Sequence, residues 1–151
     1  MPYYTLLRSF GGYRMVSLKF IRRLLIVYVF FLTWGILFKF GAPAIFLSYR
    51  YINWVPFAEP LIINGQVVWL EVAFNLVAFI PFGLLLKLTK PRWAVTKVVA
   101  LGFLLSLSYE ALQWLLTIGM SDVTDLLMNT AGVAVGSLLA IFLERTLCKK
   151  N

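Results

Sequence analysis

The chain has 151 residues, of which 62% are hydrophobic and 13% charged, with a formal net charge of +8 and a mean hydropathy of +0.89. A soluble domain with so few polar residues could not cover its surface, so the composition excludes an ordinary globular fold and indicates a membrane protein. Histidine is absent and Cys148 is the only cysteine, which excludes a Ser–His–Asp triad, a disulfide framework and a zinc site of histidine and cysteine ligands.

The N-terminal 23 residues are basic and precede the first long apolar run. A bilayer core about 30 Å thick needs about 20 mostly apolar residues per helix, and Leu24 to Phe38 or Phe40 meets that requirement. A cleaved signal peptide ending at Ala42-Pro43-Ala44 is the alternative for this segment. The length of the run, and Lys39 ahead of the cleavage motif, favour a retained span.

The next segment, from about Gly41 to Gln66, mixes prolines with aromatic residues and carries Arg50. Such a composition is not that of a solvated linker. We expect this outer loop to pack onto the helices or to lie in the membrane interface.

Three further apolar runs follow, from Val67 to Lys87, from Val95 to Ile118 and from Asp122 to Leu143. Helices satisfy their own backbone groups in lipid, so the sequence predicts an all-α integral membrane protein. The predicted fold is a four-transmembrane-helix bundle with an aromatic, Pro-rich outer loop between the first two helices. It divides into a basic cytoplasmic segment (1–23), a transmembrane domain (24–144) and a basic cytoplasmic tail (145–151).

The basic residues predict the orientation of this bundle. Of the 14 lysines and arginines, only Lys39 and Arg50 fall on the side opposite to the termini. Because cytoplasmic loops are enriched in Lys and Arg, both termini are expected in the cytoplasm, with the protein in the plasma membrane. The positive charge lies between apolar runs rather than on one folded face, so no nucleic-acid partner is expected.

Carboxyl and amide side chains recur on single faces of the last three predicted helices. A charged residue at the centre of a span costs about 2.5–3.5 kcal/mol, so such residues are functional candidates. Glu110 lies about 12 Å from the predicted end of its helix, at 1.5 Å per residue. Helical spacing gives three polar faces: Glu71 and Asn75; Ser106, Glu110, Gln113 and Thr117; and Asp122, Asp125 and Asn129. We expect these faces to meet in one pocket that opens outward, with Arg50 as a counter-charge.

Several of these residues also have a purely structural interpretation. Asp122 is a candidate N-cap of the fourth helix, with Asp125 in its first turn. Gly132-x-x-x-Gly136 indicates close helix packing. Hydrogen bonding between helices is the alternative role for the three amides Asn75, Gln113 and Asn129.

Four motifs occur in a fixed order along the chain: Arg50-x-x-Asn53-x-x-Pro56-Phe57, Asn75-x-x-x-Phe79-x-Pro81-Phe82-Gly83, Glu110-x-x-Gln113 and Ser121-Asp122-x-Thr124-Asp125-x-x-x-Asn129-Thr130-x-Gly132. In this order and spacing they resemble the VanZ-like family, over most of the chain. Many members carry an arginine just before the aspartate motif, where this chain reads Gly119-Met120. If that arginine contacts a ligand in those members, its role is either vacant in this chain or filled by Arg50.

The resemblance implies a protein of the bacterial plasma membrane with a role in resistance to teicoplanin, a glycopeptide antibiotic with a fatty-acyl chain. Such a protein would act in the outer leaflet, on membrane lipids, a lipoglycopeptide or a lipid-linked cell-wall intermediate. The expected ligand-binding residues are Arg50, Asn53, Glu71, Asn75, Glu110, Gln113, Asp122, Asp125 and Asn129. No cofactor is expected for a binding protein. The alternative is a membrane enzyme of the cell envelope in which Glu110 or Asp125 is catalytic, and Asp122 and Asp125 hold a divalent cation.

Overall fold

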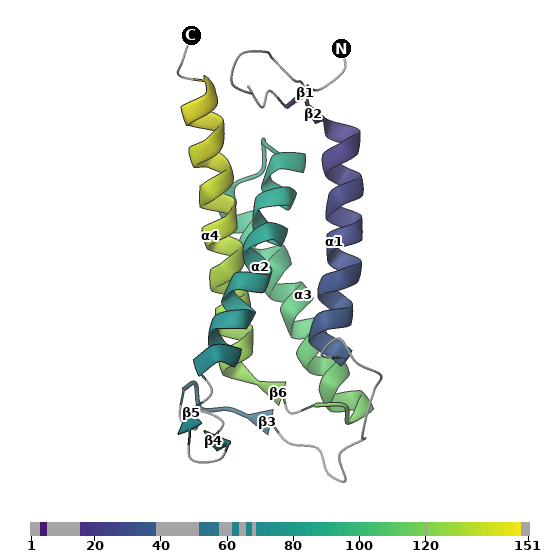
Figure 1. Cartoon of the computed structure of the whole chain (residues 1–151), viewed down its shortest axis with the longest axis vertical. Helices are drawn as coiled ribbons and strands as arrows, with labels where there is room; N and C mark the ends of the chain where they lie inside the picture. Colours follow the sequence, from purple (N-terminus) through teal and green to yellow (C-terminus); the bar gives the residue numbers. More distant parts are fainter. Residues whose placement is uncertain are drawn as a thin grey trace.

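A computed structural model describes residues 4–5, 16–38, 52–57, 62–63, 66–67, 69–119 and 121–148. Four long helices run side by side along its longest axis (Figure 1): α1 (Leu18–Phe38), α2 (Trp69–Thr89), α3 (Val95–Leu116) and α4 (Val123–Cys148). Each helix is long and apolar enough to cross a bilayer. The four-helix transmembrane bundle predicted from the sequence is therefore confirmed.

Short strands connect or extend these helices without forming a closed sheet. They are β1 (Tyr4–Thr5), β2 (Val16–Ser17), β3 (Ile52–Asn53), β4 (Ile62–Ile63), β5 (Gln66–Val67) and β6 (Ser121–Asp122). β1 pairs with β2 and β4 with β5, both antiparallel, whereas β3 pairs with β6 in parallel. The β3–β6 pair matters most here, because it joins the outer loop to the start of α4.

Two helices are longer than their apolar runs. α1 begins at Leu18 rather than Leu24, and α4 continues past Leu143 to Cys148. Arginine is a good helix former, and its long side chain reaches water while its backbone stays hydrogen-bonded in the helix. Basic residues thus end the hydrophobic stretch without ending the helix.

The closest helix contact in the bundle lies between α2 and α4, which run parallel (Figure 1). A Cβ atom at Gly132 would overlap the carbonyl oxygen of Leu76, and one at Gly136 would overlap that of Ile80. The backbones of the two helices therefore touch at these glycines. This confirms that Gly132-x-x-x-Gly136 marks a packing surface.

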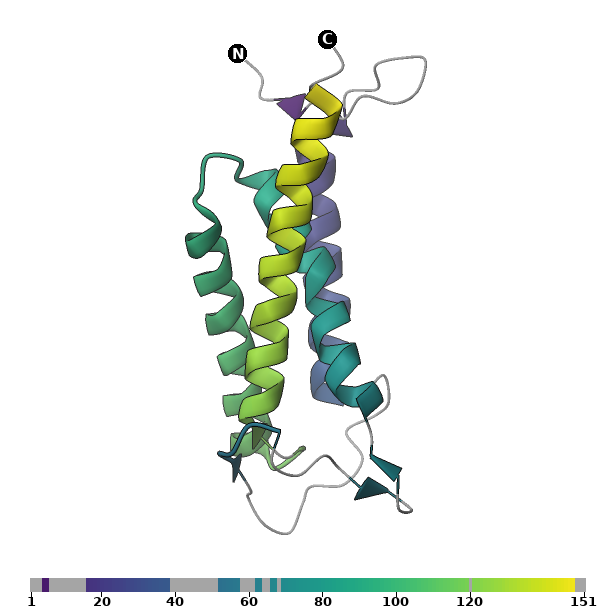
Figure 2. The same cartoon turned by 90° about the vertical axis from the view of Figure 1, so that its left-hand side faces the viewer.

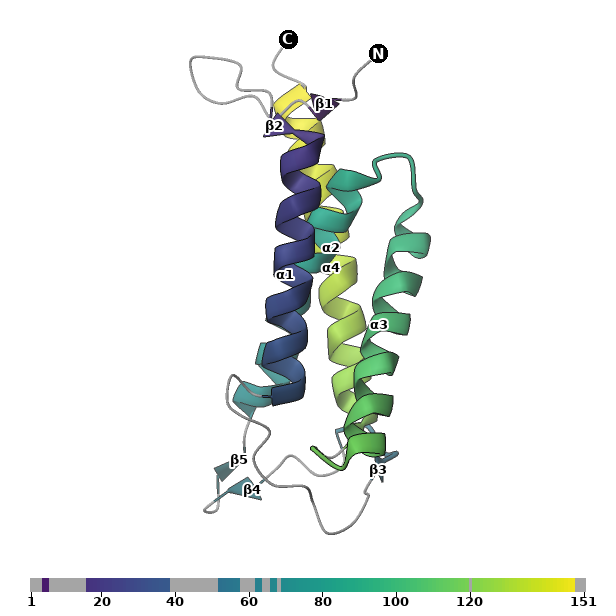
Figure 3. The ribbon, with the colours of Figure 1, turned by 90° about the vertical axis from the view of Figure 1, so that its right-hand side faces the viewer.

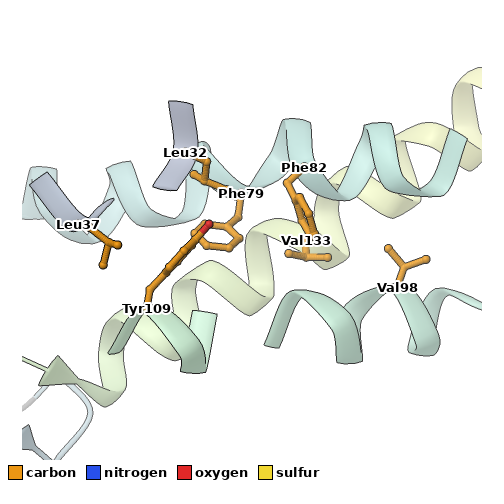
Figure 4. Packing of buried hydrophobic residues seen from close by; sticks show 7 residues of the cluster. All are labelled: Leu32, Leu37, Phe79, Phe82, Val98, Tyr109 and Val133. Atoms are coloured by element: carbon orange, nitrogen blue, oxygen red, sulfur yellow. The ribbon is translucent and has the colours of Figure 1, made fainter. Parts of the chain in front are cut away.

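The core between the helices is apolar over its central part. Figure 4 shows Phe79 and Phe82 of α2 next to Val133 of α4, with Tyr109 of α3 beside them. Phe79 and Val133 are completely buried. Large apolar side chains are instead exposed on the outer faces of all four helices, as expected where lipid is the solvent.

The two ends of the bundle are formed by different segments (Figures 2 and 3), and these segments differ in their charged residues. The start of α1, the turn between α2 and α3, and the end of α4 lie together at what we call the basic end. β3, β6 and the start of α4 lie at the opposite end, here called the acidic end. Asp122 and Asp125 are at the acidic end, whereas Lys87, Lys90 and Lys97 are at the basic end.

Candidate functional site

Glu110 is the centre of a hydrogen-bonded cluster at the acidic end. Its Oε2 accepts a hydrogen bond of 2.9 Å from the backbone N–H of Asp122, and its carbonyl oxygen accepts one of 2.8 Å from Ser121 Oγ. The residue is only 7% exposed. Because α3 ends at Leu116, Glu110 lies about 9 Å from the helix end at 1.5 Å per residue, nearer the surface than the sequence suggested. The acid is held by the connection between α3 and α4.

Asp122 links three parts of the chain. Its Oδ1 accepts a hydrogen bond of 2.6 Å from the backbone N–H of Thr124, which confirms it as the N-cap of α4. Its Oδ2 accepts a second bond, of 3.1 Å, from Asn53 Nδ2 in the outer loop. Both carboxylate oxygens are thus engaged within the protein.

The outer loop is docked on this cluster. β3 pairs with β6 so that Ile52 lies opposite Ser121 and Asn53 opposite Asp122. Four residues further on, the backbone N–H of Phe57 donates to Thr124 Oγ1 at 3.1 Å. The prediction that this loop packs onto the bundle is confirmed for the contacts of Ile52, Asn53 and Phe57, whereas the side chain of Trp54 between them is exposed.

Asp125, in the first turn of α4 as predicted, lies near Glu110. The carboxyl groups of Asp122 and Asp125 both interact electrostatically with that of Glu110. We refer to Asn53, Glu110, Ser121, Asp122, Thr124 and Asp125 as the acidic cluster. Three carboxyl groups from two helices and their connection meet here, so the site is rich in hydrogen-bond acceptors.

Two amides continue the polar contacts away from the acidic cluster. Asn129 Nδ2 of α4 donates to Ser106 Oγ of α3 at 2.8 Å. Gln113 Nε2 of α3 donates to the carbonyl oxygen of Ile36 in α1 at 3.2 Å. Both amides therefore have the interhelical role that was one of their two predicted interpretations.

Three buried amide atoms have no hydrogen-bond partner within the part of the chain that the structure describes. They are Gln113 Oε1, Asn129 Oδ1 and Asn75 Nδ2. Gln113 Oε1 must be an acceptor, because the other end of this amide donates to a carbonyl oxygen. Buried polar atoms normally find a partner, so these three atoms have hydrogen-bonding capacity that the described residues do not use.

The polar region stops inside the bundle. Beyond Ser106, the same face of α3 continues with Gly102, which lies directly against Val133. Phe82 packs beside Val133 at this level, while Phe79 lies beside Tyr109, nearer to the acidic end (Figure 4). The polar contacts between α3 and α4 therefore lie toward the acidic end of the bundle, and apolar side chains pack beyond them.

Two predicted site residues cannot be placed in this cluster. Arg50 lies outside the described residues. Glu71 is in the first turn of α2, at the acidic end, but its side chain is outside what the structure describes. Asn75 is buried on α2. The predicted meeting of polar faces is thus confirmed for α3 and α4, and it stays a prediction for α2.

The described residues do not form a complete metal site by themselves. Among them, no group of three His, Cys, Asp or Glu side chains could hold a metal ion. Asp122 uses both oxygens for protein donors. A cation at Asp122 and Asp125 would need further oxygen ligands from water or from a substrate.

Sequence reasoning missed three functional or supporting residues. Ser121 and Thr124 stand in the aspartate motif, and their position at a helix start was the available signal for hydrogen bonding to neighbouring backbone. Lys87 was interpreted only as a topology signal, but it is 5% exposed and makes two hydrogen bonds. No pattern in the sequence identifies those partners.

Taken together, the fold and the acidic cluster define a class: a multi-pass membrane protein with four spans and a buried carboxyl–amide site at one end. The sequence profile of the VanZ/LLP1 family matches residues 25–144, and the chain belongs to this family. It is similar to Protein VanZ of Enterococcus faecium, with 34% identity over 118 residues that cover 76% of this chain and 70% of that protein. No solved structure matches the chain.

Proposed function

We propose that this protein contributes to resistance against teicoplanin-type glycopeptide antibiotics by binding an amphiphile at the acidic end. The acidic end would face the cell exterior and both termini the cytoplasm, since the basic residues gather at the other end. Membership of the VanZ/LLP1 family supports the resistance role. The bound amphiphile would be a membrane lipid, the antibiotic itself or a lipid-linked cell-wall intermediate.

The observation that carries this proposal is the bond between Glu110 and the backbone of Asp122. It holds a buried acid beside two other carboxyl groups, at the point where the outer loop docks. Acids are costly in apolar helices and are rarely kept there without a function. Unpartnered atoms on Gln113 and Asn129 offer further hydrogen bonds to a polar head group.

The test is a comparison of antibiotic tolerance among variants of equal abundance in the membrane. Expression of the wild-type protein should raise tolerance to teicoplanin more than to vancomycin. Glu110→Gln, Asp125→Asn and Arg50→Ala should each reduce this difference, whereas Glu144→Gln, the same kind of change outside the acidic cluster, should leave it intact. Full tolerance in both Glu110→Gln and Asp125→Asn would show that the acidic cluster is not the functional site.

An integral membrane enzyme of the cell envelope is the second candidate. The crowding of Glu110 by two carboxyl groups favours it, because such an environment suits a general acid or base. Asp122 and Asp125 would share a divalent cation with oxygens of a lipid-linked substrate. In that case a chelator should abolish tolerance in the wild type, and Asp125→Asn should abolish the response to the chelator. If the chelator does not change antibiotic tolerance, the binding function is favoured over the enzyme.

A further inference from the structure

The turn between α2 and α3 at the basic end is unusually well fixed. Lys87 Nζ, at the end of α2, donates hydrogen bonds to the carbonyl oxygens of Pro91 at 2.8 Å and of Trp93 at 2.7 Å. The backbone N–H of Trp93 donates in turn to the carbonyl oxygen of Lys90 at 3.0 Å. Lys87 is therefore occupied inside the turn and sets the position of Trp93.

Trp93 brings together two other lysines. Lys97 Nζ lies 4.3 Å from the centroid of its ring and Lys90 Nζ lies 5.2 Å from it, both within the range of cation–π attraction. The indole also packs against the core cluster, so it is half-buried and anchored. The two ammonium groups are thus held near one ring by attraction rather than kept apart by their like charges.

Both lysines are exposed, and neither forms an ion pair with a carboxyl group among the residues that the structure describes. Glu110, Asp122 and Asp125 lie at the opposite end of the bundle. The segment from Lys87 to Lys97 contains no acidic residue, and Glu144, the acid near the end of α4 at this end of the bundle, lies outside that segment. The turn joins two membrane-spanning helices, which places it at the level of the lipid head groups.

We infer that Lys90, Trp93 and Lys97 form a binding site for the head group of an anionic phospholipid in the leaflet at the basic end. The two ammonium groups pair with the phosphate, and the indole takes its usual interfacial position between head group and acyl chain. Lys87 supports the site by fixing the turn. This site is independent of the acidic cluster and of the function proposed for it.

The test uses the purified full-length protein with equimolar phosphatidylglycerol and phosphatidylcholine, and native mass spectrometry to measure which lipid is retained. The wild type should prefer phosphatidylglycerol. Lys90→Ala/Lys97→Ala should weaken phosphatidylglycerol binding on the order of thirtyfold, from the contribution that each basic residue makes near an anionic surface. Lys90→Arg/Lys97→Arg should keep the preference, because both charges remain.

The matched control removes two exposed charges from α1 at the same end, as Arg22→Ala/Arg23→Ala. It should keep most of the preference for phosphatidylglycerol. An equal loss in both alanine pairs would overturn the inference, since it would mean that diffuse charge attracts the lipid. A wild-type protein without any preference, or a turn variant that retains it, would overturn the inference as well.

Discussion

Replacing Asp122 tests how the acidic cluster is held together. Asp122→Ala removes the acceptor for the backbone N–H of Thr124 and the acceptor for Asn53 Nδ2. A lost N-cap costs about 1 kcal/mol. A half-buried hydrogen bond to a carboxylate contributes roughly 1.5 kcal/mol. The free energy of unfolding should therefore fall by about 2.5 kcal/mol.

Asp122→Asn separates these two contributions. An asparagine side chain still offers one oxygen to the N–H of Thr124, but it presents an amide nitrogen where Asn53 also donates. The cap should survive while the bond to the outer loop is lost, at a cost of roughly 1.5 kcal/mol.

The assay is thermal unfolding of the detergent-solubilised protein, with Glu144→Ala as the control at the basic end. For a chain of this size, Asp122→Ala should lower Tm by roughly 5–10 °C and Asp122→Asn by about half as much. Equal losses in the two variants would refute the capping role. An unchanged Tm in both would refute the view that Asp122 ties the loop to the bundle.

Three further substitutions address packing and polar contacts elsewhere. Gly136→Ala should destabilise the protein by about 1–3 kcal/mol, because the added Cβ would overlap the backbone of α2. Gly119→Ala is the control and should change Tm little, because a Cβ there would make only ordinary contacts. Equal effects of the two substitutions would contradict the tight α2–α4 contact. Lys87→Met should increase hydrogen exchange in the α2–α3 turn by removing two hydrogen bonds, and unchanged exchange would count against its bracing role. Thr33→Val should cost about 1 kcal/mol in unfolding free energy by breaking the 2.7 Å bond to the Tyr109 hydroxyl. Adding Tyr109→Phe to Thr33→Val should lower the unfolding free energy little further. Fully additive losses in the double variant would contradict this hydrogen bond.

The sequence predicts most of the α3–α4 half of the site. Ser106, Glu110 and Gln113 share a helix face by their spacing, and a lipid-facing position would be costly for each of them. That cost directs the face inward, toward Asn129 and Asp122, where the structure has it. The helical spacing of these polar residues, and the cost of exposing them to lipid, were therefore sufficient to predict which face of α3 points inward.

Other contacts are beyond such reasoning. The pairing of β3 with β6 depends on which part of a long loop returns to the bundle, and loop composition does not determine that register. Lys87 looks like any basic residue at the end of a span until its carbonyl partners are known. The same is true of Tyr109, whose hydroxyl meets a threonine on a helix far away in sequence.

The packing of the bundle itself argues for a functional acidic cluster. α2 and α4 are held together by backbone contact at Gly132 and Gly136 and by the apolar side chains of Phe79 and Val133, none of which needs a polar neighbour. The carboxyl group of Glu110 lies outside this seam and adds nothing to it. A hydrophobic residue at that position would avoid the cost of placing an acid in a span, about 2.5–3.5 kcal/mol at its centre. The stability of this seam alone therefore does not account for Glu110, whereas the binding that we propose at the acidic end would.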